Sequence, residues 1–204
     1  MNFAFVIAME CEADCVRAHT EFNSVPLYVS GIGKVNAAAA AQKAIIETGA
    51  EAIVNIGLSG GFDSKMEVGA LREVVSAVEY DFDLAKLNGT RVGQKDEYDT
   101  PYIETATVGL YESGILATGD HFNDSENDFS LIREDLKASL RDMEGAAIAH
   151  VCKKAGVKCF LLKCVTNVAG KGLMLGQYEK NKSIALNVLT NAIPKYVDEI
   201  CRIC

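Results

Sequence analysis

Two carboxylates flank a methionine in the segment Asp142-Met143-Glu144, and an alanine-rich apolar run follows it directly. The pattern predicts a strand that ends here and a helix that begins at residue 145. A carboxylate at the edge of a sheet and beside a helix N-terminus is favoured by the helix dipole, and it can hold a diol. The alternative is that Asp142 and Glu144 only add negative charge to the first turn of an ordinary helix.

Small, glycine-rich or acidic residues also follow the other predicted strands. In α/β sheets a ligand usually binds beyond the carboxyl ends of the strands, so a site is expected there. Glycine lets backbone amides approach a ligand without a Cβ in the way. The segments are Ala8-Met9-Glu10-Cys11-Glu12, Ser30-Gly31-Ile32-Gly33-Lys34, Asn55-Ile56-Gly57-Leu58-Ser59-Gly60-Gly61, Gly119-Asp120-His121-Phe122 and Thr166-Asn167-Val168-Ala169-Gly170.

Short apolar runs rich in β-formers alternate with helical patterns, which predicts an α/β chain with a mostly parallel or mixed sheet. Strands are expected at 2–8, 26–30, 52–56, 71–77, 103–109, 114–118, 139–143 and 158–165. Helices are expected at 10–20, 34–48, 125–134, 145–155 and 181–200. No linker, repeat or low-complexity tract divides the chain, so residues 1–204 are predicted to form a single domain.

The composition narrows the class of partner. A formal net charge of -8 disfavours nucleic acid and anionic membranes, which need clustered Lys and Arg, and leaves a small polar molecule. Residues 3–9 are apolar but lack a basic leader and meet Glu10 and Glu12 at once, so they are read as a buried strand and not a signal peptide. No apolar run approaches the ~20 residues of a membrane span.

The seven cysteines carry little functional information. Most lie in apolar elements, which favours reduced thiols in a cytoplasmic protein. Cys201 and Cys204 have the spacing of a metal or redox pair, but no second pair of ligands accompanies them. We therefore predict neither a metal site nor a cofactor.

Two motifs fit familiar sites only in part. The Ser30 to Asn36 segment lacks the Ser or Thr that follows Lys in a phosphate-binding loop, and Asn36 stands where a dinucleotide fingerprint needs a small residue. Gly57-Leu58-Ser59-Gly60-Gly61 fits the nucleophile elbow of serine hydrolases, with His121 or His150 as a possible base. An elbow must lead into a helix, however, and this segment leads toward another strand.

Taken together, the segments resemble the purine nucleoside phosphorylase superfamily, and most closely its methylthioadenosine/S-adenosylhomocysteine nucleosidase branch, over nearly the whole chain. The resemblance rests on Ala8-Met9-Glu10-x-Glu12, Ser30-Gly31-Ile32-Gly33-Lys34-Val35, Asn55-x-Gly57-x-x-Gly60-Gly61, Thr118-Gly119-Asp120-x-Phe122 and Met143-Glu144-x-Ala146-Ala147-Ile148-Ala149-His150-Val151-Cys152. It implies a three-layer α/β/α domain with a central mixed, partly barrel-like sheet. It also implies a metal-free purine nucleosidase that works without a cofactor.

By this resemblance Glu12 would orient and deprotonate an attacking water, while Glu144 would hold the ribose hydroxyls and favour a cationic sugar. Asn167 would donate to N7 of the leaving base. The other residues placed in the substrate site are Ala8, Met9, Ile32, Ser59, Gly60, His121, Phe122, Asp142, Met143 and Ala169. Phosphorylases of the same family surround phosphate with arginines, and this chain offers few cations at the motif positions, which favours water over phosphate.

Three departures from the family pattern leave alternatives open. Adenine-specific nucleosidases have an aspartic acid at the position of Asn167, which cannot give up a proton but can donate to N7 while it meets a 6-keto oxygen. The substrate is thus an adenine nucleoside or a 6-oxopurine nucleoside such as inosine or futalosine, and a binding-only relative is the third alternative. Leu58 replaces a small hydroxyl residue, and the connection from the first helix to Ser30 is shorter than usual.

Members of this branch are commonly homodimers whose partner contributes apolar residues over the 5'-substituent of the substrate. The polar, aromatic segment 80–102 is predicted to make that contact, with Tyr80, Phe82 and Tyr98 as candidates. The alternative is a solvated loop with ordinary aromatic residues.

Overall fold

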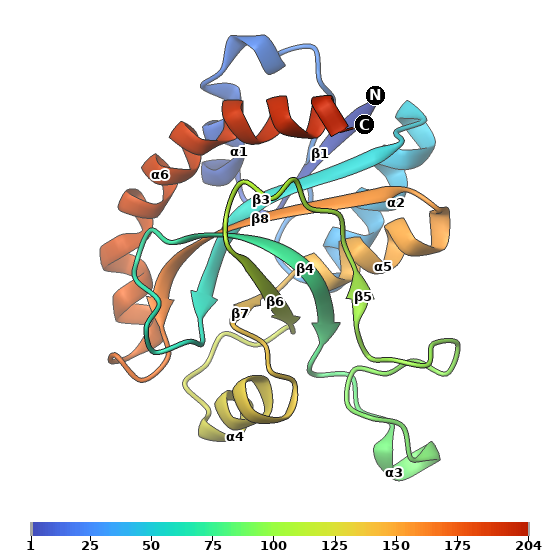
Figure 1. The fold of residues 1–204 in the computed structure, drawn as a ribbon, viewed down its shortest axis with the longest axis vertical. Helices are drawn as coiled ribbons and strands as arrows, with labels where there is room; N and C mark the ends of the chain where they lie inside the picture. Colours follow the sequence, from blue (N-terminus) through green and yellow to red (C-terminus); the bar gives the residue numbers. More distant parts are fainter. Residues whose placement is uncertain (1, 204) are drawn as a thin grey trace.

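A twisted, mixed sheet of eight strands forms the centre of the computed structural model, which describes residues 2–203 (Figure 1). The strands are β1 (Phe3–Ile7), β2 (Leu27–Val29), β3 (Ala52–Gly61), β4 (Leu71–Glu79), β5 (Ile103–Glu104), β6 (Ser113–Thr118), β7 (Leu140–Asp142) and β8 (Lys158–Val168). The α-helices are α1 (Glu10–Arg17), α2 (Lys34–Thr48), α3 (Ala85–Asn88), α4 (Glu126–Ser130), α5 (Gly145–Ala155) and α6 (Met174–Ile203). A 3-10 turn covers Thr20–Phe22, and a π-helical turn, Leu131–Asp135, continues α4.

Part of the sheet closes into a barrel. The strand order is β2-β1-β3-β7-β6-β4-β5, and β8 pairs with both β3 and β4. The pairs β3–β8, β8–β4, β4–β6, β6–β7 and β7–β3 therefore form a closed ring of five strands. β1 and β2 extend β3 as a parallel wing. The predicted mixed, partly barrel-like sheet is confirmed.

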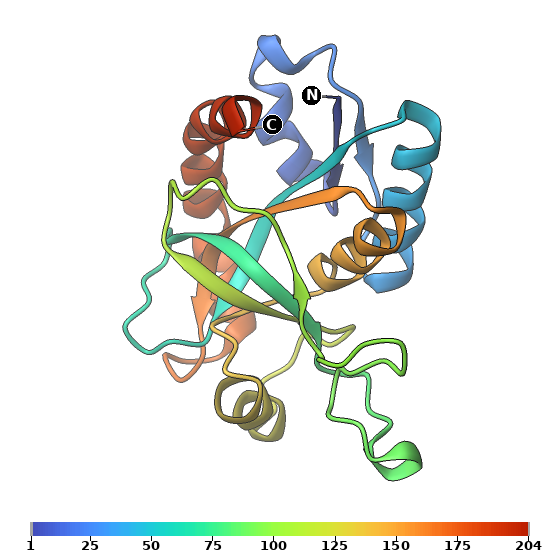
Figure 2. The same ribbon diagram turned by 45° about the vertical axis from the view of Figure 1, so that its right-hand side comes forward.

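Helices cover the sheet on two sides, with α1 and α6 on one and α2 and α5 on the other (Figures 1 and 2). The alternation of side chains along β1 shows how the sequence produces this, because successive residues of a strand point to opposite faces. Ala4 and Val6 belong to the core cluster that contains the buried alanines of α2. Phe5 and Ile7 belong to the cluster that contains Tyr196 of α6.

The predicted elements are all present, but several boundaries were wrong. β3 and β8 run to Gly61 and Val168 because their glycine-rich and polar ends stay extended within the barrel. Hence Ser59 lies inside a strand and not on a nucleophile elbow. β5 has only two residues of the predicted 103–109, and α6 begins at Met174, seven residues before the predicted start.

Candidate active site

One cavity of about 380 Å³ opens where β1, β3, β7 and β8 end. It is lined by Ala8, Met9, Glu12, Ile32, Leu58, Ser59, Gly60, His121, Phe122, Arg141, Asp142, Met143, Glu144, Thr166, Asn167, Leu175 and Tyr178. These residues include every predicted site residue except Ala169. The structure thus brings together, in one cavity, segments from both ends of the chain.

Glu12 lies in the first turn of α1 and is only 4% exposed. One of its carboxylate oxygens accepts a hydrogen bond from the Leu58 amide at 2.8 Å, and the other accepts one from the Met9 amide at 3.1 Å. A Cβ at Gly57 would lie 2.9 Å from the first oxygen, so this carboxylate requires glycine there. Burial raises the pKa of Glu12, which makes it a stronger base than an exposed carboxylate.

Glu144 stands at the junction of β7 and α5, where the sequence predicted it. It is 8% exposed, and its Oε1 accepts a hydrogen bond from the Gly33 amide at 2.8 Å. Burial, followed by the negative charge of Asp142, raises the pKa of Glu144 to about 7. A carboxyl group that titrates near neutrality and faces a cavity is typical of a functional site.

Asp142 lines the same cavity, but other groups already occupy both of its oxygens. Oδ2 lies 2.8 Å from Nζ of Lys163 and accepts from the Gly145 amide, while Oδ1 accepts from the Thr118 hydroxyl at 2.5 Å. Asp142 therefore fixes the junction of β7 and α5. This refines the predicted role of Asp142 as a substrate-binding residue.

Lys163 is a residue of the site that the sequence analysis missed. Its side chain is 2% exposed and points from β8 to the oxygens of Asp142 and Asn55, 2.8 and 2.7 Å away. The nearby carboxylates, Asp142 first, raise its pKa against the effect of burial. This buried cation, paired with Asp142, offsets part of the charge of the acidic cavity, which would otherwise be costly to bury.

A second wall of the cavity carries amide, hydroxyl and guanidinium groups. Asn167 is buried in β8, where its Oδ1 accepts from the Thr166 hydroxyl at 2.5 Å and its Nδ2 lies 3.2 Å from Sδ of Met174. Arg141 reaches the same wall from β7 and was not predicted. The hydroxyl of Ser59 is buried without a hydrogen-bond partner in the described chain, so it can serve a ligand.

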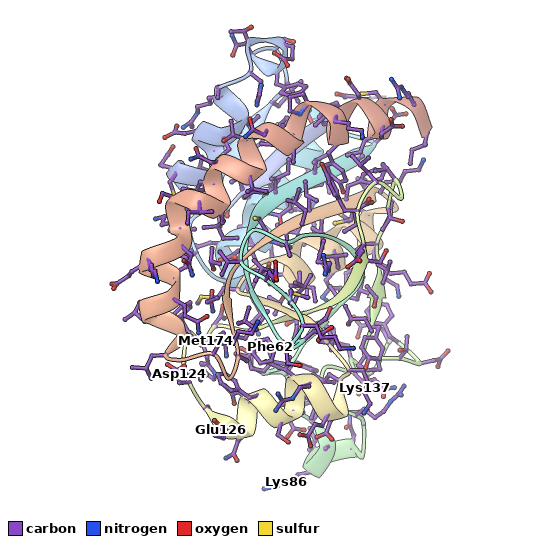
Figure 3. All side chains as sticks on the ribbon, turned by 60° about the vertical axis from the view of Figure 1, so that its left-hand side comes forward. Phe62, Lys86, Asp124, Glu126, Lys137 and Met174 are labelled. Carbon is purple, nitrogen blue, oxygen red and sulfur yellow. The ribbon has the colours of Figure 1, made fainter. Side chains whose placement is uncertain are left out.

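The early start of α6 explains two further residues that sequence reasoning missed, Leu175 and Tyr178. The carboxylate of Asp124 accepts a hydrogen bond from the Met174 amide at 2.9 Å, which holds the first turn of α6 at the cavity (Figure 3). An acidic residue near a helix start is favourable, but Asp124 is 50 positions away from Met174 in the sequence. The sequence alone therefore did not indicate that α6 begins at Met174.

Two predictions concerning position were wrong. Ala169 is buried in a core cluster with Phe62 and Met174 and does not line the cavity. Tyr80 is only 3% exposed, in the same cluster, and is therefore not available to contact a partner subunit. The reason is that β4 extends to Glu79, which carries the following tyrosine into the core.

No group of three or more His, Cys, Asp or Glu side chains within residues 2–203 is arranged to hold a metal ion. Across the same residues, every helix falls short of the length or apolarity that crossing a bilayer requires.

Comparisons with known proteins identify the family and the fold. A family model described as the phosphorylase superfamily matches residues 19–197. Over 157 residues the chain is 32% identical to aminodeoxyfutalosine nucleosidase of Campylobacter jejuni, covering 71% of this chain and 68% of that one. Over 202 residues it is 27% identical to 5'-methylthioadenosine/S-adenosylhomocysteine nucleosidase of Lysinibacillus sphaericus, covering 84% and 88%. The fold matches native futalosine hydrolase of Helicobacter pylori with a TM-score of 0.87, 21% identity and 97% coverage of both chains.

Proposed function

This chain belongs to the phosphorylase superfamily, and we propose that it hydrolyses the N-glycosidic bond of a purine nucleoside with a substituent at the 5' position. The observation that supports this most directly is that Glu12 and Glu144, which are 132 positions apart in the sequence (144 minus 12), line one cavity. Breaking this bond requires a nucleophile at the anomeric carbon, a stabilised cationic sugar and a hydrogen bond to the leaving base. The cavity offers a group for each requirement.

Glu12 is the general base. Two backbone amides hold its carboxylate in place, and burial raises its pKa, so that it can take a proton from an attacking water. Help of this kind is typically worth about 10²–10⁴-fold in rate. The product would be a free base and a ribose derivative.

Glu144 binds the ribose hydroxyls. Its Oε1 is held by the Gly33 amide, which leaves the second oxygen for the sugar. As the bond to the base breaks, positive charge develops on the sugar, and a negative group in a water-poor cavity stabilises that charge more than water does. Met143 and Phe122 supply apolar contacts to the sugar and the base, and the buried hydroxyl of Ser59 supplies a further polar contact.

Water is favoured over phosphate as the nucleophile because of where the cations lie. Lys163 binds Asp142 and Asn55, and Arg141, the only arginine among residues 2–203 that lines the cavity, stands on the wall of Asn167. A doubly charged phosphate would therefore face Glu12 and Glu144 without a free cation beside them, and like charges at close range repel.

Base release in phosphate-free buffer tests this proposal. Methylthioadenosine, S-adenosylhomocysteine, adenosine and inosine are supplied in turn, and the free base is quantified by chromatography. Glu12→Gln should lower kcat by about 10²–10⁴-fold with little change in KM, because it removes the base but keeps the shape. Glu10→Gln, on the exposed side of the same helix, is the matched control.

Two alternatives give different results in the same assay. If release requires added inorganic phosphate, the protein is a phosphorylase. If nucleosides bind but no base is released by the wild type or by either variant, the protein is a nucleoside-binding relative without turnover.

We further propose that the protein works as a homodimer. Large apolar side chains are exposed in the segments that line the cavity or adjoin it in sequence; they are Ile32, Val35, Phe122, Leu173 and Leu175. Val35 is 81% exposed at the start of α2, next to the cavity residue Ile32. Val35→Glu should convert a dimer into monomers in sedimentation velocity and raise KM for 5'-substituted nucleosides. A monomeric wild type would contradict the proposal.

A further inference from the structure

Arg141 is a buried cation with no ion-pair partner among residues 2–203. It is 5% exposed and lines the cavity, and its guanidinium donates to the side-chain oxygen of Asn123 at 3.2 Å and to the carbonyl of Asn123 at 2.9 Å. The same group lies over the rings of Phe62 and Phe129, 5.3 and 5.5 Å from their centroids. All of these contacts are with neutral groups, and the carboxylates of Asp128 and Asp124 act on the guanidinium only from beyond ion-pair distance. A desolvated charge held in this way is costly unless it serves a ligand.

The register of the barrel aims Arg141 and Asn167 at the same space. Gly60 of β3 pairs directly with Arg141 of β7 on one side and with Asn167 of β8 on the other. Directly paired residues project from the same face of a sheet, so the two side chains flank the position of a missing side chain. A Cβ at Gly60 would lie 3.1 Å from the methyl carbon of Met174 and 3.2 Å from Nδ2 of Asn167, so glycine leaves room for these two side chains.

The amide of Asn167 presents its donor to this space. Its oxygen already accepts the hydroxyl hydrogen of Thr166, whereas its Nδ2 has only the sulfur of Met174 as a partner. A thioether sulfur is a weak acceptor and no donor, so the reverse orientation of the amide would place two acceptors against each other. Nδ2 is thus free to exchange a weak partner for a stronger acceptor.

The acceptors on this wall already have donors within the protein, among them Asp124 with the Met174 amide and Asp128 with the Asn123 side chain. The carbonyl of Asn123, beside the cavity residue Phe122, is taken by Arg141. Asp142 adjoins Arg141 in sequence but forms its bonds with Lys163, Thr118 and Gly145. A base bound here meets donors from two side chains, one of them charged, while the carboxylate of Asp142 is held by other groups.

From this arrangement we propose that Arg141 determines base specificity, and that with Asn167 it selects a 6-oxopurine nucleoside over a 6-aminopurine nucleoside. This inference rests on the proposed nucleosidase function. The 6-oxygen and N7 of such a base are adjacent acceptors, which match the guanidinium and the Nδ2 group. The 6-amino group of adenine is a donor, so it would face donors and leave them unpaired, and sites of this kind discriminate strongly.

Binding of the free bases tests specificity without requiring turnover. Hypoxanthine and adenine are titrated by calorimetry into the wild type, Arg141→Met, Asn167→Asp and the control Arg133→Met, whose arginine is exposed. Loss of one charge-assisted hydrogen bond corresponds to about 10- to 100-fold in affinity. The wild type should therefore bind hypoxanthine at least about 10-fold more tightly, and Arg141→Met should remove most of that preference. Asn167→Asp should shift it toward adenine, and Arg133→Met should leave it unchanged.

Equal or tighter binding of adenine by the wild type would overturn the inference, and this comparison needs no variant to fold. Loss of affinity for both bases by the same factor in Arg141→Met would overturn the role of Arg141. Kinetics separate the two proposals. Release of base from adenosine but not from inosine would support the proposed nucleosidase function and contradict the proposed 6-oxo specificity. Tighter binding of hypoxanthine without release of base from any nucleoside would support the proposed specificity and contradict the proposed nucleosidase function.

Discussion

Replacing Glu144 with glutamine should make the protein more stable at alkaline pH and should abolish base release. Burial and the charge of Asp142 raise the pKa of Glu144 from 4.5 to about 7, so the ionised carboxylate is destabilising in the folded state. At ~1.4 kcal/mol per pH unit, this corresponds to about 3 kcal/mol. Glutamine carries no charge, and its side-chain oxygen can still accept the hydrogen bond from the Gly33 amide.

The sign of the effect follows from proton binding. Between pH 4.5 and about 7 the folded protein holds a proton on Glu144 that the unfolded chain has lost, so wild-type stability falls as the pH rises through this window. The full penalty is present above pH 7. Glu144→Gln should therefore be more stable than the wild type by about 3 kcal/mol at pH 8, and by about 1 kcal/mol or less at pH 5.

Urea unfolding at pH 5 and pH 8, followed by circular dichroism, measures both differences. Glu67→Gln, at an exposed glutamate, is the control and should match the wild type at both values. Base release by Glu144→Gln should be lost at every pH, because the ribose has lost its carboxylate. A variant that is less stable than the wild type at pH 8, or a stability difference that does not change between the two pH values, would refute the reasoning.

Three other substitutions test the framework around the cavity. Lys163→Met leaves the buried charge of Asp142 unpaired and should cost about 3–5 kcal/mol in urea unfolding; an unchanged midpoint would contradict the pairing. Gly57→Ala places a Cβ against the Glu12 carboxylate. This variant should lose most of its kcat while its free energy of unfolding changes little. Glu73→Gln replaces a buried carboxylate that accepts hydrogen bonds from four successive backbone amides of the loop before β6. These bonds should weaken, and amide hydrogen exchange in that loop should accelerate.

The sequence predicted the family and most of the cavity because strand ends carry their own signals. Glu12 and Glu144 each stand where an apolar strand gives way to a helix, and the glycines of β3 mark a place where the backbone must come close to another group. The membership in the phosphorylase superfamily that these signals implied is confirmed. Such signals are local, so they can be read from the sequence without knowing which strands pair.

Lys163 and Arg141 could not be found in this way, because their roles depend on pairing across the barrel. Arg141 is the middle residue of the short strand β7 and Lys163 is the middle residue of β8, and in a sequence a charged residue within a strand is taken as solvent-exposed. The pairing of β7 and β8 with the two sides of β3 sets Arg141 opposite Asn167 with Gly60 between them, and in the folded barrel Lys163 reaches Asp142. The positions of Lys163 and Arg141 in the cavity thus follow from strand pairing, whereas the carboxylates that we propose act on the sugar, Glu12 and Glu144, lie just after strand ends.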